Sequence, residues 1–275
     1  MSSTPHSKIL VKATNIEQEF QVGDEIIRPL QKVSFELAEN SFNIIYGPSG
    51  SGKSTMLNVL TGLQRPTRGQ VLFEGKDVYA LKPDELAHFR ANRIGIVYQT
   101  NYWVKSLSVI DNVSMPLFFL GYSRMQAAKI AMTALDRVNM GQYAKKFPAM
   151  LSGGEQQRIA TARALVNDPL FIIADEPTGS LDSKNGDMIM KLLQDCQTHL
   201  KRTVILVTHN MEYLPLADHL IHIEDGKIQE TRDGNIKKTA EALLDDLKSR
   251  LNGLSSTKHT QRHKEEEQYN AVHKK

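Results

Sequence analysis

The chain has 275 residues, of which 40% are hydrophobic and 24% charged, a composition typical of globular proteins that excludes a wholly disordered chain. The net charge of +3 is small and Lys and Arg are widely spread, so we expect no nucleic-acid partner. A single cysteine, Cys196, excludes an intramolecular disulfide. Because the sequence shows neither a spanning apolar run nor a signal peptide, we expect a cytoplasmic protein whose link to a membrane comes from a partner.

The first predicted elements are two strands that form an antiparallel sheet. Residues 9–11 are all apolar, and residues 33–37 alternate between apolar and polar side chains. The two segments flank the turn signal Gly23-Asp24. Phe20 stands just before this turn, where an exposed aromatic ring can stack on a nucleotide base. A half-buried strand residue would show the same spacing, so both interpretations of Phe20 stay open at this point.

The next stretch, residues 47–54, reads Gly-Pro-Ser-Gly-Ser-Gly-Lys-Ser and fits the pattern G-x-x-x-x-G-K-[ST]. It lies between an apolar strand at 42–46 and a helix that starts at 55. Glycines let backbone N–H groups turn inward, the helix N-terminus adds positive charge, and Lys53 can reach outer phosphates. Ser54 is then a natural Mg²⁺ ligand. The strand and helix on either side favour a phosphate-binding loop over an ordinary surface turn.

Further strands and helices follow in an order that predicts an α/β fold. Strands are expected at 69–73, 93–98, 170–174 and 203–207, and a hairpin at 220–223 and 227–229. Helices are expected at 84–91, 109–119 and 123–139, and after residue 151. The runs at 170–174 and 203–207 are continuously apolar, as in strands buried on both faces. They favour a parallel sheet with helices on either side, interrupted by a helical insertion that begins near residue 100.

Aromatic and apolar residues stand at the start of this insertion. Tyr102, Trp103 and Leu107 follow Gln99 beside a predicted loop. If exposed, they would form a docking groove for a partner, and if buried they would belong to the core. The sequence favours neither alternative for Trp103.

Acidic residues follow one buried strand and a histidine follows the next. Asp175 and Glu176 come directly after 170–174, and His209 ends the strand at 204–208. In phosphate-loop proteins such carboxylates complete Mg²⁺ coordination and polarise the attacking water. A lone histidine is usually structural, but His209 is expected at the same carboxyl edge, where open α/β sheets bind ligands.

The last part of the chain, residues 231–275, is polar and rich in charges of both signs. Apolar residues recur there in steps of four and three, at Ala240, Leu244, Leu247, Leu251 and Leu254. This spacing predicts one amphipathic helix, which either docks on its own domain or pairs with another chain. We expect disorder after Ser255.

Taken in order, these motifs resemble those of ATP-binding cassette (ABC) ATPases over about residues 8–230. The motifs are the phosphate loop, Gln99, Leu-Ser-Gly-Gly-Glu-Gln-Gln-Arg at 151–158, the strand and acids at 171–176, Gly-Ser-Leu-Asp-Ser at 179–183, and Thr208-His209. The Leu-Ser-Gly-Gly-Glu signature is close to diagnostic of the family. Residues 111–117 and 174–183 are further similar to the lipoprotein-release, macrolide-export and cell-division branch.

The resemblance implies a phosphate-loop NTPase (RecA-like) fold: a parallel sheet core, an antiparallel β subdomain, a helical subdomain at about 100–165 and a C-terminal helical tail. The ATPase domain would span 1–230 and the tail 231–275. An integral membrane permease and a second copy of the chain are the implied partners, with the protein peripheral on the cytoplasmic face of the membrane.

The resemblance also implies a site for ATP and Mg²⁺. In it, Glu176 is the general base, His209 contacts the γ-phosphate, and Gln99 faces the attacking water. Ser54, Gln99 and Asp175 serve the metal. The implied nucleotide-binding residues are Phe20, Gly47, Pro48, Ser49, Gly50, Ser51, Gly52, Lys53, Ser54, Thr55, Ser152, Gly153, Gly154, Glu155 and Asp182. Ser152 to Gly154 would bind the nucleotide held by the other subunit, and Asp182 would line the dimer seam.

The expected function is therefore ATP hydrolysis by a head-to-tail dimer that drives a separate membrane protein. One rival is a non-transport ABC ATPase acting in nucleic-acid repair or translation. Such proteins usually carry fused second cassettes or long coiled-coil inserts, which this sequence lacks. Another is an ATP-switched regulator of a membrane-bound cell-wall hydrolase.

Overall fold

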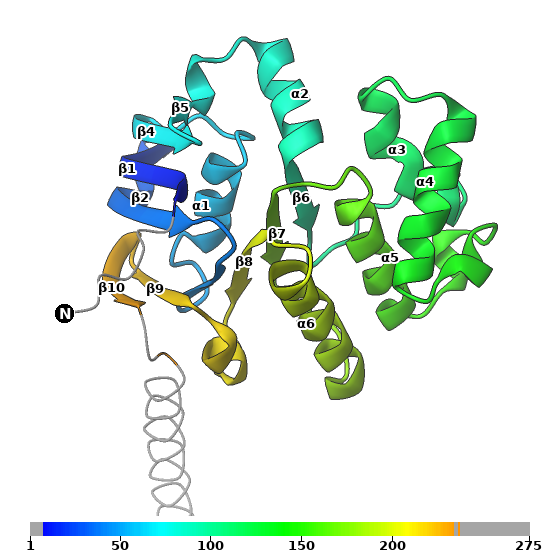
Figure 1. The fold of residues 1–275 in the computed structure, drawn as a ribbon. Coiled ribbons are helices and arrows are strands. Elements are labelled where there is room, and N and C mark those ends of the chain that lie inside the picture. The colour runs from blue at the N-terminus through cyan, green and yellow to red at the C-terminus, as the bar shows by residue number, and fades with distance from the viewer. Residues whose placement is uncertain (1–7, 234–235, 237–275) are drawn as a thin grey trace, which may run out of the picture.

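The computed structural model describes residues 8–233 and 236. Two sheets organise this part of the chain, a four-stranded sheet in the order β2-β1-β4-β5 and a six-stranded sheet in the order β10-β9-β3-β8-β7-β6 (Figure 1). The strands are β1 (Ile9–Val22), β2 (Glu25–Ala38), β3 (Phe42–Tyr46), β4 (Arg68–Phe73), β5 (Lys76–Asp77), β6 (Ile94–Val97), β7 (Phe171–Asp175), β8 (Thr203–Thr208), β9 (His219–Glu224) and β10 (Lys227–Asp233). The helices are α1 (Lys53–Leu60), α2 (Pro83–Arg93), α3 (Val109–Phe119), α4 (Arg124–Arg137), α5 (Gly153–Leu165) and α6 (Ser183–Thr198).

The six-stranded sheet is parallel except for β10, as the apolar runs predicted. Its strands β9, β3, β8, β7 and β6 all point the same way. Every residue of β3 and of β8 is buried, which requires helices on both faces. The carboxyl ends of these strands consequently share one edge of the sheet, where Tyr46 pairs with Thr208 and Val97 pairs with Ala174.

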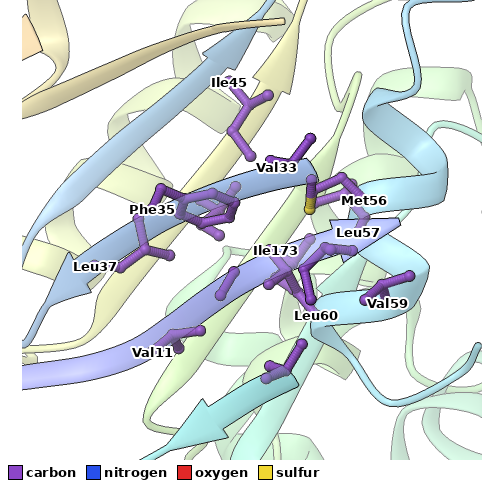
Figure 2. Close-up of a cluster of buried hydrophobic side chains, with 14 of the residues drawn as sticks. Val11, Val33, Phe35, Leu37, Ile45, Met56, Leu57, Val59, Leu60 and Ile173 are labelled. Atoms are coloured by element: carbon purple, nitrogen blue, oxygen red, sulfur yellow. The ribbon is translucent and has the colours of Figure 1, made fainter. Parts of the chain in front are cut away.

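Alternate side chains of this sheet enter different cores. On one face, Ile45 and Ile173 pack against Met56 and Leu60 of α1, in the cluster shown in Figure 2. The antiparallel sheet closes the same cluster with Val11, Val33, Phe35 and Leu37. On the other face, buried side chains of the same strands pack against α6; they include Ile44, Ile172, Leu206, Ile189 and Leu193. Helices α1 and α6 therefore lie on opposite faces of the six-stranded sheet (Figure 1).

The antiparallel sheet is confirmed, but its first two strands are longer than the sequence predicted. Strands β1 and β2 form one hairpin that continues to the turn at Gly23, where φ is +62°. The extension mixes polar residues with apolar ones, of which Val22, Ile26 and Ile27 near the turn are exposed. Backbone hydrogen bonds between the strands hold it without a regular apolar pattern. The apolar pattern at 9–11 and 33–37 therefore marked only the buried base of the hairpin.

The helical insertion is also confirmed. Helices α3, α4 and α5 share a third core that contains Val113, Leu117, Ala131, Leu135 and Ile159. Helix α3 has the predicted bounds, and Ser108 caps it by accepting a hydrogen bond from the Asp111 N–H. One boundary was wrong by a residue: Arg93 ends α2 and does not begin β6, since a basic residue is favourable in the last turn of a helix.

The structure separates the two aromatic residues at the start of the insertion. Trp103 is half-buried against the third core, its Nε1–H donates to Gln156 Oε1 at 2.9 Å, and Arg163 lies 4.5 Å from the ring centroid. Tyr102 is 69% exposed. The core interpretation therefore holds for Trp103, while Tyr102 faces solvent.

The end of the described chain remains attached to the sheet. Strand β10 continues to Asp233, and Ile236 is buried in the core on the α6 face. The predicted amphipathic helix lies outside the described residues. Within residues 8–233, no helix combines the length and the apolar character needed to cross a bilayer.

Cys196 lies in α6, is 2% exposed, and its burial raises the pKa of the thiol to about 12. Only the thiolate is reactive, so at pH 8 the ionised fraction is on the order of 10⁻⁴. We therefore expect Cys196 to react with a disulfide reagent at least about 100-fold more slowly in the native protein than after unfolding in guanidinium, followed by thionitrobenzoate absorbance. Equal rates in both states would contradict this burial.

Candidate active site

The loop between β3 and α1 carries the predicted phosphate-binding residues. Gly47, Gly50 and Gly52 have φ values of +155°, +80° and +101°. A Cβ on Gly47 would lie 1.9 Å from Ile223 O, and one on Gly52 would lie 2.1 Å from Pro29 O. Nothing lies within 4 Å of the corresponding position on Gly50. Both the positive φ and the close backbone packing thus require a glycine at 47 and at 52, whereas at 50 only the positive φ does.

Lys53, the first residue of α1, folds back over this loop. Its Nζ donates to Gly47 O at 2.9 Å and to Pro48 O at 2.7 Å, and the residue is only 8% exposed. Burial lowers the pKa of Lys53, while the charges of Glu176 and Asp175 act in the opposite direction. A buried ammonium whose hydrogen-bond partners are neutral carbonyls attracts an anion strongly.

Two acidic residues face the loop from the end of β7. Burial raises the pKa of Asp175, and so does the charge of Glu176; a hydrogen bond from the Ser54 side chain and the charge of Lys53 lower it. The Ser54 hydroxyl and the Asp175 carboxyl therefore lie near each other, between the start of α1 and the end of β7. Glu176 has a φ of +46°, and its N–H donates to Val207 O of β8 at 2.9 Å. This conformation turns the chain sharply just after the strand.

His209 is part of the same cluster, which resolves the alternative left open by the sequence. Its Nδ1 lies 2.8 Å from Glu176 Oε1, and Thr208 Oγ1 lies 3.5 Å from Glu176 Oε2. The carboxylate side chain is 16% exposed and that of His209 is 64% exposed. The pair therefore presents a hydrogen-bonded carboxylate and imidazole at the carboxyl edge of β7 and β8.

Gln99 and Phe20 lie in other elements. Gln99 follows β6, the strand next to β7, and its Nε2 is 3.0 Å from the position of a Cβ on Gly179. Phe20 lies in β1 opposite Ile27 of β2 and is 39% exposed. Its ring is thus only partly covered by the sheet.

The signature residues begin α5 and form a capping box. Ser152 N donates to Glu155 Oε2 at 2.8 Å, and Glu155 N donates to Ser152 Oγ at 3.4 Å. A Cβ on Gly154 would meet the side chain of Asn185 at 2.6 Å, but one on Gly153 would meet only Leu181, at 3.8 Å. Packing within the chain thus requires a glycine at 154 and leaves the surface of Gly153 open.

Asp182 is linked to the signature through Asn185, a residue that the sequence did not single out. Asp182 caps α6 by accepting from Asn185 N at 2.9 Å, and the Asn185 side chain donates to it at 2.8 Å. These bonds from Asn185 lower the pKa of Asp182. The structure thus joins the signature to Asp182 at the start of α6, a helix that lies on the opposite face of the sheet from α1 (Figure 1).

The described residues contain no group of three or more His, Cys, Asp and Glu side chains arranged to hold a metal. A cation at this edge would instead find the Ser54 hydroxyl, the Asp175 carboxylate and, on the next strand, the Gln99 amide. Hydroxyl, amide and carboxylate oxygens suit Mg²⁺, which keeps several waters and binds substrate phosphates.

Comparisons with known proteins show similarities that concern the family of the chain. The model of the family described as "ABC transporter" matches residues 30–179. An uncharacterized ABC transporter ATP-binding protein of Thermotoga maritima is 39% identical over 222 residues, 81% of this chain and 94% of that protein. The lipoprotein-releasing system ATP-binding protein LolD of Buchnera aphidicola is 36% identical, covering 81% of this chain and 97% of that one.

The chain is also similar to part of a larger relative and to solved structures. It is 41% identical to the macrolide export ATP-binding/permease protein MacB of Rhodospirillum rubrum, of which it covers 35%. The dimeric structure of MJ0796, described as a bacterial ABC transporter cassette, matches with a TM-score of 0.77 and 38% identity, over 82% of this chain and 98% of that one. A post-hydrolysis dimer of MJ0796 bound to ADP and Pi matches equally well. The chain therefore belongs to the ABC transporter family, as an ATP-binding subunit with ATPase activity.

Proposed function

We propose that two copies of the chain pair head to tail around two ATP molecules and that the ATP cycle drives a separate integral membrane permease. The observation that carries the proposal is the surface of the signature. Gly154 packs on Asn185 of α6, whereas nothing in the described part of the chain approaches the Cβ position of Gly153 closer than 3.8 Å. The backbone at Gly153 is therefore open to the nucleotide bound by a second copy. MJ0796, a relative of 38% identity, is itself dimeric.

ATP binding is assigned to the loop and to Phe20. Backbone N–H groups of residues 49–55 surround the phosphates, and Lys53 neutralises charge on the β- and γ-phosphates. Its present hydrogen-bond partners, Gly47 O and Pro48 O, are neutral carbonyls, so no salt bridge has to be broken before the ammonium meets an anion. The partly exposed ring of Phe20 stacks on adenine.

Mg²⁺ is assigned to Ser54, Gln99 and Asp175. The influence of the Ser54 side chain on the pKa of Asp175 supports this assignment, since it indicates that the two oxygen ligands lie near each other. When bound, the cation neutralises charge on the transferring phosphoryl group. In the chain itself, Asp175 holds the Ser54 hydroxyl in place and Gln99 orients the attacking water from the neighbouring strand.

Hydrolysis is assigned to Glu176 and His209. Glu176 accepts a proton from the water that attacks the γ-phosphate. His209 holds the Glu176 carboxylate through the 2.8 Å contact of its Nδ1 with Oε1, and the imidazole also contacts the γ-phosphate. Asn185 keeps Asp182 and the start of α5 together at the dimer seam. Ser152, Gly153 and Gly154 of one copy then contact the γ-phosphate held by the other.

The partner is a membrane permease acting on a substrate at or beyond the membrane, and the chain sits on the cytoplasmic face. The similarity to proteins named for lipoprotein release and macrolide export supports this class. The boundary predicted between residues 230 and 231 lies inside β10, so we propose that the ATPase domain extends to at least residue 236 and that the tail follows it. Since β10 runs to Asp233 and Ile236 is buried, a deletion that spares the sheet has to begin after 236.

Purification of the tagged chain from membranes tests this assignment against the two rivals. We expect an integral membrane protein to be recovered in a stable, stoichiometric complex that hydrolyses ATP. Recovery of DNA or ribosomes without a membrane protein would favour the repair or translation class. Recovery of a membrane-bound cell-wall hydrolase whose activity follows ATP would favour the regulator.

Replacement of Glu176 by Gln removes the proton acceptor and keeps the side-chain shape. We expect ATP binding to persist and turnover to fall by about 100-fold or more, with dimer accumulating on size-exclusion chromatography in ATP. The exposed Glu212→Gln is the matched control and should behave as the natural chain. Normal turnover by Glu176→Gln would remove Glu176 from the role of general base.

Replacement of Asp175 by Asn tests the Mg²⁺ assignment, with the exposed Asp187→Asn as its control. We expect half-maximal ATPase activity to require about tenfold more Mg²⁺. Because the pKa of Asp175 is raised in the folded chain, its ionised form opposes folding at neutral pH, and Asp175→Asn should unfold at a higher temperature. An unchanged Mg²⁺ requirement in this folded variant would overturn the assignment.

A further inference from the structure

The turn between β9 and β10 contacts the phosphate loop, although the two are far apart in the sequence. Gly226 N donates to Ser51 O at 3.1 Å. On its other side, Gly226 O accepts from Gln31 N at 2.7 Å, and Gln31 Nε2 donates to Asp225 O at 3.1 Å. The turn thus joins strand β2 to the middle of the phosphate loop through backbone hydrogen bonds.

The same three segments are packed too closely for any side chain between them. Gly226 is buried with a φ of +73°, and a Cβ on it would lie 2.7 Å from Pro29 O. Gly52 would meet the same carbonyl at 2.1 Å, and Gly47 would meet Ile223 O at 1.9 Å. The backbone of the loop therefore packs directly against Pro29 of β2 on one side and against the end of β9 on the other.

The bond to Gly226 fixes the orientation of one particular peptide group. In a trans peptide the C=O and the N–H point in opposite directions. Because the carbonyl of Ser51 points at the Gly226 N–H, the N–H of Gly52 in the same peptide points the other way, away from the β9–β10 turn. That N–H belongs to the set that the proposed function assigns to the phosphates.

We infer that Gly226 is a positioning residue for nucleotide binding, acting through the Ser51–Gly52 peptide, with Gln31 holding the turn in register. The inference rests on the proposed function of the loop. Gly226 does not touch the nucleotide. It prevents the peptide from rotating, so that the loop binds phosphate without first being reordered.

The test is Gly226→Ala in the full chain, with binding of a fluorescent ATP analogue and steady-state ATPase measured together. Any residue at 226 with a side chain has to move away from Pro29, which breaks or lengthens the bond to Ser51. We expect the Kd for the analogue and the KM for ATP to rise about five- to tenfold, while kcat changes less than twofold. Gln31→Ala, which removes only the bond to Asp225, should shift Kd and KM in the same direction by a smaller factor.

Gly75→Ala is the matched control. Gly75 has a φ of +78°, in the turn between β4 and β5, and nothing lies within 4 Å of an added Cβ. An alanine at 75 therefore has to adopt the same unfavourable positive φ as an alanine at 226, but without contact to the phosphate loop. We expect it to lower the melting temperature but to leave Kd and KM unchanged.

An unchanged Kd in folded Gly226→Ala, or an equal rise in Gly75→Ala, would overturn the inference. If Gly226→Ala does not fold, Gln31→Ala decides, and an unchanged Kd there would have the same consequence. Lys53→Ala separates this failure from a failure of the proposed function. It should lose nucleotide binding in every case, and normal binding by Lys53→Ala would contradict the assignment of the loop itself.

Discussion

The buried ammonium of Lys53 is the interaction on which the rest of the site depends. It is held by two carbonyls of its own loop and lies within the field of Asp175 and Glu176. A cation in this position is costly unless the backbone around it is rigid and opposite charge is near. The phosphate loop meets the first condition because its glycines let it pack directly on the backbone of β2 and β9. The carboxylates at the end of β7 meet the second.

The parallel sheet brings these groups together. Loops that follow neighbouring parallel strands emerge at one edge, so β3, β6, β7 and β8 deliver Lys53, Gln99, Asp175 and His209 to the same place. Strong local features then set the directions of the side chains. Glu176 adopts a positive φ, and its carboxylate is held by His209 and Thr208. Catalysis at such an edge relies on this preorganisation, because little rearrangement remains when substrate binds.

Helix α6, on the face of the sheet opposite α1, connects the signature to the rest of the chain. Helices α5 and α6 join the signature to Asp182 through Asn185, while the third core connects α5 with α3 and α4. A displacement of the start of α5 would therefore also displace α3 and α4, since packed helices move as units. Trp103, bonded to Gln156 of α5 and stacked on Arg163, links the loop that follows Gln99 to the same helix. These contacts connect the loop after Gln99 directly to α5 and, through the third core, to the rest of the insertion.

Several features were determined by the sequence alone. The sequence of the phosphate loop, the apolar strands and the acids after β7 predicted an α/β fold and an ATP site, and α3 has its predicted bounds, because these features depend on local chemistry and periodicity. The outer half of the β1–β2 hairpin was not predicted, since backbone pairing holds it without a regular alternation of buried and exposed residues. The exposure of Trp103 and the environment of His209 were also decided only by the tertiary structure. So were the contacts of Asn185 and Gly226: the sequence marked Asp225-Gly226 only as a hairpin turn, because the partner that gives Gly226 its role, Ser51, lies in another part of the chain.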